Sequence, residues 1–420
     1  MFKKKIILII ILIISLVGVT VVVLDKAANT PKYQNKINSI ILKNFFLLPD
    51  IIKSSVMIFS GRRSFSNLFN DYNVKFLPET QYININLDRK EIDYKKLNRN
   101  SFYIEVYKED LIITRKNNEF YKINFSELKK EEKKIEFKRY EINDSFSKNR
   151  AIFDTLVIDD KIYVTTNTQY NDCKKLEIYS SKIGEKLDFK IFKSFDECIS
   201  IGMGTSRLEK YKFNGREGIL ITTQDADNDR PGVKPQNDNS IFGKILFMDI
   251  KNKEFEIFSK GHRNAQGLFA KDDIILSTEH GPKGGDEINK IEFNKNYGWP
   301  IASYGKSYAK KDLKYLKSHK ENGFQEPLYA FVPSIGISQL IILPDTFNSE
   351  WQSSALITSL NGRSIYRVKF EDDNFDKIIY IEKIYVGERI RDIKYVDKLN
   401  FIIVALERTG DIGILKNELN

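Results

Sequence analysis

The chain has 420 residues, of which 41% are hydrophobic, 12% aromatic and 30% charged. This length suffices for two average domains or one large all-β domain, and the composition excludes a wholly disordered chain and a polytopic membrane protein. The 67 basic and 57 acidic residues give a net charge of +10, but segments such as 129–134 mix both signs. We therefore expect a solvated surface and no nucleic-acid binding.

The N-terminus has the features of a signal-anchor. Three lysines at positions 3–5 precede a charge-free apolar run from Ile6 to Leu24, and its 19 residues span about 28 Å as a helix. The lysines are expected to stay cytoplasmic, which places the rest of the chain on the periplasmic or extracellular side. A cleaved secretory signal is the alternative, although the run is long for one and the sequence after it is a poor cleavage site. Residues 1–24 are therefore predicted to be a single-pass helix in the inner or cytoplasmic membrane.

Residues 25–75 are predicted to be a juxtamembrane spacer. Their apolar stretch at 40–59 is interrupted by charged residues and by Pro49, so it is too broken to cross a membrane. An interfacial or packed helix fits this pattern better.

The two cysteines of the chain, Cys173 and Cys198, lie 25 residues apart. In an oxidising compartment such a pair can form a disulfide worth about 3 kcal/mol, and two buried free thiols are the alternative. Neither cysteine has a histidine or second cysteine at the spacing of a metal site.

One short pattern recurs from residue 76 onward: a turn, then three or four β-forming apolar residues, the run closing on a small residue. It occurs six times and ends at Thr114, Thr165, Thr222, Ser277, Thr358 and Ala405. The successive spacings are 51, 57, 55, 81 and 47 residues, and the long one indicates an insertion around 295–330. Strands that return at such a period are typical of four-stranded propeller blades. The predicted fold is all-β, a six-bladed β-propeller over residues 76–420 that follows the N-terminal transmembrane helix.

Polar residues follow these six strands. They include Arg115, Asn167, Asp225, His280 and Asn361. Equivalent strand ends of a propeller lie around one mouth of its central channel, so we expect these groups to form a ring there.

The strongest motifs lie in the second half of the chain. They are Ser259-Lys-Gly-His-Arg-Asn-Ala-Gln-Gly-Leu268, Thr278-Glu-His-Gly-Pro-Lys-Gly-Gly-Asp-Glu-Ile-Asn289 and Asn296-Tyr-Gly-Trp-Pro300. These segments resemble the core of the glucose/sorbosone dehydrogenase family, soluble-type quinoproteins that use pyrroloquinoline quinone (PQQ) and calcium on a six-bladed propeller. Shorter matches keep the family's order at 243–245, 332–334 and 389–392. The resemblance covers about residues 100–418 and is dense only from 243 onward.

The resemblance implies a cofactor site rich in arginine. PQQ is a flat quinone with three carboxylates, and arginine offers such groups a planar, permanently charged fork of donors. By resemblance, Arg263 faces the reactive edge of the quinone with Asn264 beside it, and Arg389 and Arg391 hold its carboxylates. Taken without the resemblance, the last two would be exposed side chains on one face of a strand.

The resemblance also implies two calcium ions. Backbone carbonyls of Gly281 and Pro282 would bind the Ca²⁺ that touches the quinone, and Glu287 with a main-chain oxygen of Tyr297 would bind the second. Calcium prefers oxygen ligands, including backbone carbonyls. A plain glycine-rich turn is the alternative interpretation of this segment.

Two positions depart from the family pattern. Met203 stands where the family dehydrogenases place a histidine as general base, and a thioether cannot usefully accept a substrate proton. The chain has only three histidines, and His280 or Asp225 is the candidate replacement. A cofactor-binding lysine of the family is replaced by Asn361, for which Arg363 is the candidate substitute.

The sequence thus predicts an exported PQQ-dependent sugar dehydrogenase in which Arg263, Asn264 and His280 carry catalysis. It would transfer a hydride from an aldose or related alcohol to PQQ with Ca²⁺ assistance and pass electrons to a respiratory acceptor. One alternative is a non-catalytic propeller that binds a carbohydrate or an envelope partner, supported by the missing base. Another is a calcium-dependent lactonase, which would need several carboxylates and Asn side chains around a central calcium.

Overall fold

The structure is a computed structural model that describes residues 86–92, 101–146, 150–199, 204–226, 233–307 and 315–416. The predicted anchor at 1–24, the predicted spacer at 25–75 and Met203 lie outside these residues. In the described ranges, no helix combines the length and apolar character needed to cross a bilayer.

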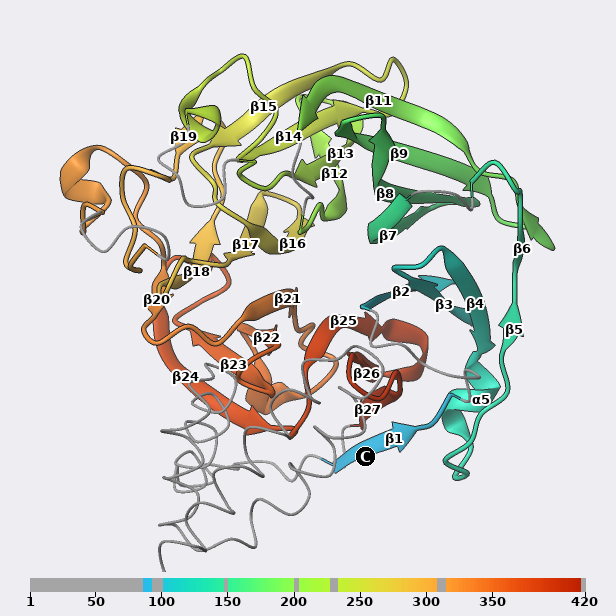
Figure 1. Cartoon of the computed structure of the whole chain (residues 1–420). Coiled ribbons are helices and arrows are strands. Elements are labelled where there is room, and N and C mark those ends of the chain that lie inside the picture. Colours follow the sequence, from blue (N-terminus) through green and yellow to red (C-terminus); the bar gives the residue numbers. More distant parts are fainter. Residues whose placement is uncertain are drawn as a thin grey trace, which may run out of the picture. The chain divides into compact units, whose positions relative to one another are not determined.

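Six sheets form a ring about a common axis (Figure 1). The first blade contains β2 (Phe102–Tyr107), β3 (Asp110–Arg115), β4 (Glu119–Asn124) and β5 (Lys138–Arg139). The second contains β7 (Arg150–Ile158), β8 (Lys161–Tyr170), β9 (Cys173–Lys182) and β11 (Lys190–Ile199). The third contains β12 (Leu208–Phe213), β13 (Arg216–Thr222), β14 (Lys244–Asp249) and β15 (Phe255–Lys260), to which β19 (Lys295–Asn296) adds a parallel fifth strand.

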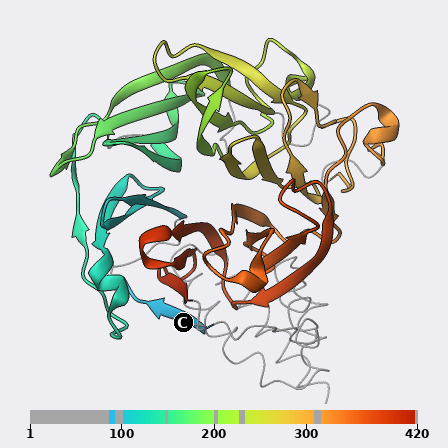
Figure 2. The same ribbon diagram turned by 180° about the vertical axis from the view of Figure 1, so that it is seen from behind.

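The other three blades complete the ring, which Figure 2 shows from behind. The fourth contains β16 (Ala265–Lys271), β17 (Ile274–Glu279), β18 (Asp286–Lys290) and β20 (Tyr329–Phe331). The fifth contains β21 (Ile337–Ile342), β22 (Ser354–Ser359), β23 (Ser364–Phe370) and β24 (Ile378–Tyr385). The sixth contains β25 (Ile390–Val396), β26 (Phe401–Leu406) and β27 (Ile412–Lys416), with β1 (Asn86–Lys90) as its outer strand.

Short elements connect these strands. They are helix α5 (Phe125–Lys129), the parallel pair β6 (Glu141–Ile142) and β10 (Lys186–Leu187), and the 3₁₀ turns η2 (Lys234–Gln236), η3 (Lys320–Asn322), η4 (Ser349–Trp351) and η5 (Asp397–Leu399).

The six-bladed propeller predicted from the sequence is confirmed. Each of the six predicted strands is the second strand of its blade, namely β3, β8, β13, β17, β22 and β26. The predicted insertion is also present, because residues 291–328 lie between β18 and β20 and contribute β19 to the neighbouring blade.

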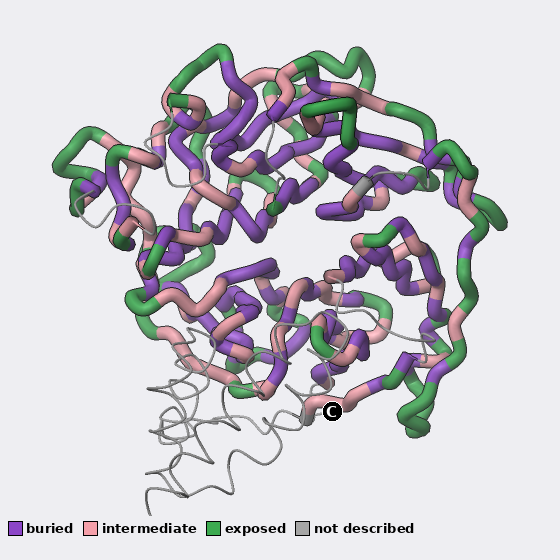
Figure 3. Tube along the Cα trace, in the orientation of Figure 1, coloured by how far each residue is buried: buried purple, intermediate pink, exposed green. Residues whose placement is uncertain are grey.

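The continuous apolar runs of these strands follow from the way blades pack. Successive side chains of a strand point to opposite faces, so Ile219 and Ile221 pack toward the second blade while Leu220 packs toward the fourth. Among the described residues, each of six buried hydrophobic clusters joins two adjacent blades in this way. A strand buried on both faces therefore carries no polar alternation. Figure 3 shows the burial of these inner segments and the exposure of the outer strands and turns.

Candidate active site

Polar residues gather at one end of the ring, where the innermost strand of a blade begins and its second strand ends. Arg263 and Asn264 directly precede β16, and His280 follows β17. Arg389 precedes β25, and Glu407 follows β26. Because the two strands of each pair are antiparallel, these groups lie at the same mouth, as the sequence predicts.

Arg207 ties the blades together close to this mouth. Its side chain is only 1% exposed, and its Nη1 donates to Asp154 and Asp392, each at 3.0 Å. Its remaining donors reach the backbone carbonyls of Gln266 at 2.7 Å and Arg391 at 3.0 Å. Burial raises the pKa of Asp154 to about 6, against the opposing charge of Arg207. Strands from the second, third, fourth and sixth blades are thus held in fixed positions by one guanidinium.

Arg389 and Arg391 share the carboxylate of Glu407. Arg389 Nε donates to it at 2.9 Å and Arg391 Nη2 at 3.0 Å. Burial alone would raise the pKa of Glu407, but the charges of Arg391 and Arg389 outweigh it and hold that pKa at about 2. Lys116 of the first blade is a further cation here, since its pKa is lowered by burial and by the charge of Arg391. This part of the mouth therefore carries more positive than negative charge.

Asn264 is linked to the arginine pair through Gln266. Gln266 Nε2 donates to Asn264 Oδ1 at 3.0 Å, and Gln266 Oε1 accepts from Arg391 Nη1, also at 3.0 Å. A polar chain thus fixes the orientation of the Asn264 amide relative to Arg391.

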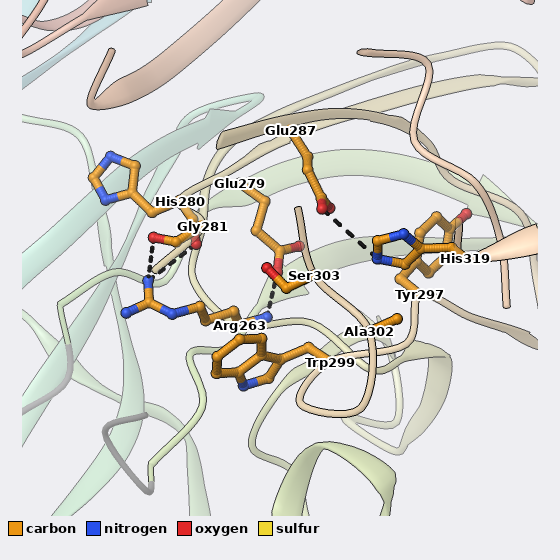
Figure 4. A pocket seen from close by; sticks show the side chains of 10 residues that line it. All are labelled: Arg263, Glu279, His280, Gly281, Glu287, Tyr297, Trp299, Ala302, Ser303 and His319. Carbon is orange, nitrogen blue, oxygen red and sulfur yellow. Dashed lines mark hydrogen bonds and ion pairs between the residues drawn. The ribbon is translucent and has the colours of Figure 1, made fainter. Parts of the chain in front are cut away.

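Arg263 lies across the loop that follows β17 (Figure 4). Its Nη1 donates to the backbone carbonyls of His280 at 3.0 Å and Gly281 at 2.9 Å. Its backbone N–H donates to the Glu279 carboxylate, and its guanidinium lies 5.3 Å from the ring centre of Trp299. Both carbonyls therefore face a cationic group.

Asp286 holds the shape of this loop. Its Oδ1 accepts from the Gly281 N–H at 3.2 Å, and its Oδ2 accepts from three consecutive backbone N–H groups at 335–337. A Cβ on Gly281 would lie 2.1 Å from the Gly285 carbonyl oxygen, so only glycine permits this close approach.

His280 lines the same cavity as Glu279, Glu287 and His319, but its ring points away from those three side chains (Figure 4). Its Nε2 is buried and has no hydrogen-bond partner within the described ranges. Burial lowers the pKa of His280, and the charges of Arg391 and Arg263 lower it further against the opposing effect of Asp286. The imidazole is therefore neutral at neutral pH and can accept a proton.

Behind Arg263 lies a small cavity, here called the second cavity, which Arg263, His280 and Gly281 of the mouth line together with two buried carboxylates. Glu279 accepts from His262 Nδ1 at 3.0 Å, and the His262 ring stacks on Tyr297 with centres 4.6 Å apart. Glu287 Oε1 lies 3.7 Å from His319 Nε2. Burial and the neighbouring Glu279 raise the pKa of Glu287 well above its usual range.

Comparison with known proteins decides the family. Residues 208–413 match the family model for glucose/sorbosone dehydrogenase. The chain belongs to this family.

Three curated relatives match parts of the chain. The aldose sugar dehydrogenase YliI of Escherichia coli is 27% identical over 250 residues, which cover 56% of this chain and 65% of that protein. Quinoprotein glucose dehydrogenase B of Acinetobacter calcoaceticus is 32% identical over 164 residues, 34% of this chain and 32% of the relative. An uncharacterized protein of Synechocystis is 37% identical over 183 residues, 43% of each chain. The chain thus covers less than two thirds of the length of each of these relatives.

Solved structures agree on the fold. The apo-form of the soluble aldose sugar dehydrogenase from Escherichia coli superposes with a TM-score of 0.64 at 19% identity, covering 80% of this chain and all of that one. The PQQ-bound form of an aldose sugar dehydrogenase from Streptomyces coelicolor gives 0.58 at 16% identity, covering 79% of this chain and 98% of that one. At these identities the likeness shows the propeller fold.

The structure places most of the residues expected from the glucose/sorbosone dehydrogenase resemblance in two neighbouring groups. Arg263, Asn264, His280, Gly281, Arg389 and Arg391 lie at the mouth, and Pro282 lies in the loop held by Asp286. Glu287 and Tyr297 both line the second cavity. The calcium and cofactor roles of these residues stay predictions, and the described residues contain no group of three or more His, Cys, Asp or Glu side chains that could hold a metal.

Three further carboxylates are engaged by other groups of the protein. Asp225, the second candidate base, is 3% exposed and accepts a 2.6 Å hydrogen bond from the Trp299 indole N–H. Asp154 and Asp392 both accept from Arg207 Nη1, each at 3.0 Å.

Sequence reasoning missed three residues that organise the mouth: Glu407, Gln266 and Arg207. Glu407 directly follows the last of the six recurring strands, as His280 follows the strand of the fourth blade. The expectation that polar residues after these strands line the mouth would therefore have found Glu407. Arg207 and Gln266 gave no such signal, because their roles depend on contacts between blades that are distant in sequence.

Proposed function

We propose that this protein is a PQQ-dependent dehydrogenase that oxidises a sugar, such as an aldose, or a related alcohol. Two of its relatives are named an aldose sugar dehydrogenase and a quinoprotein glucose dehydrogenase. The observation that carries the proposal is the cationic mouth, where Arg263, Arg389 and Arg391 lie on the rim and the latter two share one carboxylate.

The donors at the mouth fit the quinone. Two arginines against Glu407 leave an excess positive charge, which matches a ligand with three carboxylates. The Arg391 side chain is 12% exposed and held by Gln266 and Glu407, whereas the Arg389 side chain is 43% exposed. Arg391 would therefore act as a fixed anchor for a carboxylate, and Arg389 can adjust to one.

The bound quinone supplies an acceptor for the hydride of the substrate. The chain would orient it through Arg263 and Asn264, which stand on the fourth blade facing the arginine pair of the sixth. Gln266 fixes the Asn264 amide, so the geometry is set before any ligand arrives.

The loop at Gly281 and Pro282 fits calcium. The Gly281 carbonyl accepts from Arg263 Nη1 at 2.9 Å, so a Ca²⁺ there would share this oxygen with the guanidinium or displace it. Calcium takes backbone carbonyls among its ligands. We assign these two carbonyls to the Ca²⁺ beside the quinone, and Asp286 keeps them in place through the Gly281 N–H.

His280 is the group we assign as general base. Its buried Nε2 lacks a partner in the described part of the chain, and its lowered pKa keeps it neutral. His262 is committed to Ser259 and Glu279, and His319 lies in the second cavity. Substrate proton abstraction would therefore fall to His280, with Met203 in the family's position for the base.

We also propose that the catalytic domain acts outside the cytoplasmic membrane and passes its electrons to a respiratory acceptor. The charge-free run at 6–24 behind three lysines supports an uncleaved anchor. The Cys173–Cys198 disulfide supports an oxidising compartment.

A non-catalytic propeller is the second candidate, and the Met203 substitution favours it. Binding of the quinone and abstraction of a proton use different groups, so affinity for PQQ can survive the loss of turnover.

The test is turnover by the purified full-length protein with PQQ and Ca²⁺, measured by reduction of an artificial dye with a panel of aldoses and alcohols. The proposal predicts substrate-dependent dye reduction that requires PQQ. Binding of PQQ without turnover on any substrate would favour the non-catalytic propeller.

A further inference from the structure

Two exposed lysines face each other on the surface that flanks the mouth. Lys283 of the loop after β17 and Lys306 of the insertion form an antiparallel bridge, in which the backbone N–H of each donates to the carbonyl of the other at 2.9 Å. Side chains directly opposite in such a pair lie on the same face, with Cβ atoms about 5 Å apart. Both positive charges are therefore presented to solvent together, directly after Gly281 and Pro282 of the mouth.

A third lysine and an apolar side chain extend this surface. Lys317 Nζ donates to the Gly305 carbonyl at 2.8 Å, which brings its ammonium beside Lys306. Burial lowers the pKa of Lys317, and the charge of Lys306 lowers it further. Val332 is 67% exposed, and a Cβ on Gly284 would lie 3.8 Å from its Cγ1. We call this surface the basic patch; it consists of Lys283, Lys306, Lys317 and Val332.

Close backbone packing holds the segments of the basic patch together. A Cβ on Gly285 would lie 2.5 Å from the backbone N of Gly305, and one on Gly305 would lie 2.4 Å from the carbonyl oxygen of Gly284. The Gly285 N–H also donates at 2.8 Å to the carbonyl of Phe331, the residue before Val332. Only glycine permits such close approach, so the loop, the insertion and the end of β20 form one continuous surface.

Stability does not account for this arrangement. Like charges directly opposite each other in an antiparallel pair are destabilising, and an exposed valine contributes no burial. Positive charges around an apolar side chain do suit a transient protein interface, which is small and relies on complementary charge for rapid encounter.

We propose that the basic patch docks a small acidic electron-carrier protein, which accepts electrons from the site at the mouth. A carrier bound at Lys283 would stand next to the Gly281–Pro282 segment of the proposed cofactor site. Each encounter would transfer one electron, so two carriers in turn would take the two electrons of one turnover while two protons pass to water. The electron-accepting role rests on the proposed function, whereas the docking itself does not.

Docking is tested without quinone or sugar, so it can fail independently of the dehydrogenase activity. Full-length protein is titrated into a small acidic cytochrome c followed by NMR, and into a basic cytochrome c of similar size. The acidic cytochrome should bind, and its affinity should fall at least about tenfold as salt rises from about 0.01 to 0.1 M, because the Debye length shortens from about 30 to 10 Å. Equal affinity for the two cytochromes, or no binding of the acidic one at low salt, would overturn the proposal.

Charge reversal locates the surface. Lys283→Glu with Lys306→Glu should weaken binding of the acidic cytochrome at least about tenfold at about 0.1 M salt, and the same pair changed to Gln should weaken it less. The control, Lys212→Glu with Lys251→Glu, makes the same change in net charge at two exposed lysines at the end of the third blade opposite the mouth. It should weaken binding less than about twofold. Equal losses in the two double reversals would show that net charge alone matters and would overturn the basic patch.

Turnover separates docking from chemistry. With PQQ, Ca²⁺ and an aldose, Lys283→Glu with Lys306→Glu should reduce the acidic cytochrome at least about tenfold more slowly than the wild type and a small neutral dye at the same rate. Equal rates of cytochrome reduction would overturn the electron-accepting role of the docked carrier. A wild type that reduces neither acceptor would overturn both that role and the proposed dehydrogenase, while the titration would still decide the docking.

Discussion

At the scale of single residues, the mouth is organised by one carboxylate that the sequence motifs did not identify. Glu407 binds Arg389 and Arg391 at once, and Arg391 is further held by Gln266. Charge-assisted bonds of this kind fix a guanidinium in one geometry. Arg389 and Arg391 are therefore oriented by the protein before a ligand binds.

The Glu407 pairing predicts a dependence of stability on pH. Its pKa is about 2 in the folded protein and near 4.5 when unpaired, so its contribution is complete above pH 4.5 and is lost as pH falls toward 2. The shift corresponds to about 3 kcal/mol at neutral pH and less than half of that at pH 3. Urea unfolding should give a free energy of unfolding that is higher for the wild type than for Glu407→Gln. This difference should shrink by more than half between pH 7 and pH 3. An equal difference in the free energy of unfolding at pH 7 and at pH 3 would contradict the stabilising ion pairs of Glu407.

His280 carries the second prediction at this scale. His280→Gln should lower kcat by about 10²–10⁴-fold, since that is the usual contribution of a general base, while the affinity for PQQ changes little. Rapid-mixing kinetics with the reconstituted enzyme would measure both quantities. If turnover survives the substitution, another group abstracts the proton and the role of His280 is to pack beside the cofactor.

At the scale of strands, sequence patterns identified one strand in each blade. The second strands are buried on both faces and therefore read as short apolar runs, such as Leu111–Thr114. Outer strands gave no comparable signal because they mix exposed and half-buried residues, as β24 does. The sequence Asn-Leu-Asp-Arg-Lys of β1 has no apolar pattern at all, and only its pairing with β27 makes it a strand.

The residues of the candidate site, like the strands, could be predicted only where the signal is local in the sequence. Residues within local motifs, such as Arg263 and Gly281, could be found from the sequence. Contacts between blades, such as those of Arg207, depend on the closed ring and left no local trace.

The disulfide of the second blade was a prediction that the structure confirms. Cys173 begins β9 and Cys198 lies near the end of the adjacent β11, with Cα atoms 5.8 Å apart. Closing this loop should contribute about 3 kcal/mol, so reduction should lower the urea midpoint. Thiol labelling of denatured, non-reduced protein from its native compartment should find no free thiol. Two labelled cysteines would show that the bridge does not form there.

At the scale of the whole molecule, the propeller is closed by pairing its two sequence ends. β1 pairs with β27 over five residues, so the sixth blade takes its outer strand from the start of the propeller and its other three from the end. Such closure holds the first and last blades together. Every blade can then present its strand ends at a single mouth.

The N-terminal anchor is a prediction about the whole chain. Membrane-extracted protein should retain residues 1–24, because their charge-free length matches a bilayer and a cleavage site is poorly formed. Intact-mass analysis decides this directly. A mature N-terminus near residues 25–30 in a soluble fraction would exclude the anchor. It would still be consistent with export of the protein.

The central claim is that the cationic mouth is a calcium-assisted quinone site, and a binding titration tests it most directly. Full-length protein is titrated with PQQ by calorimetry and absorbance, with and without Ca²⁺. The account predicts one PQQ per chain, binding that strengthens with Ca²⁺, and a loss of about 10–100-fold in affinity for Arg391→Ala, the usual range for a charged hydrogen bond. Arg216→Ala, which removes a 41% exposed arginine paired with Glu256 on the third blade, serves as the control and should bind like the wild type. Absence of PQQ binding by the wild type with Ca²⁺ present would contradict the account.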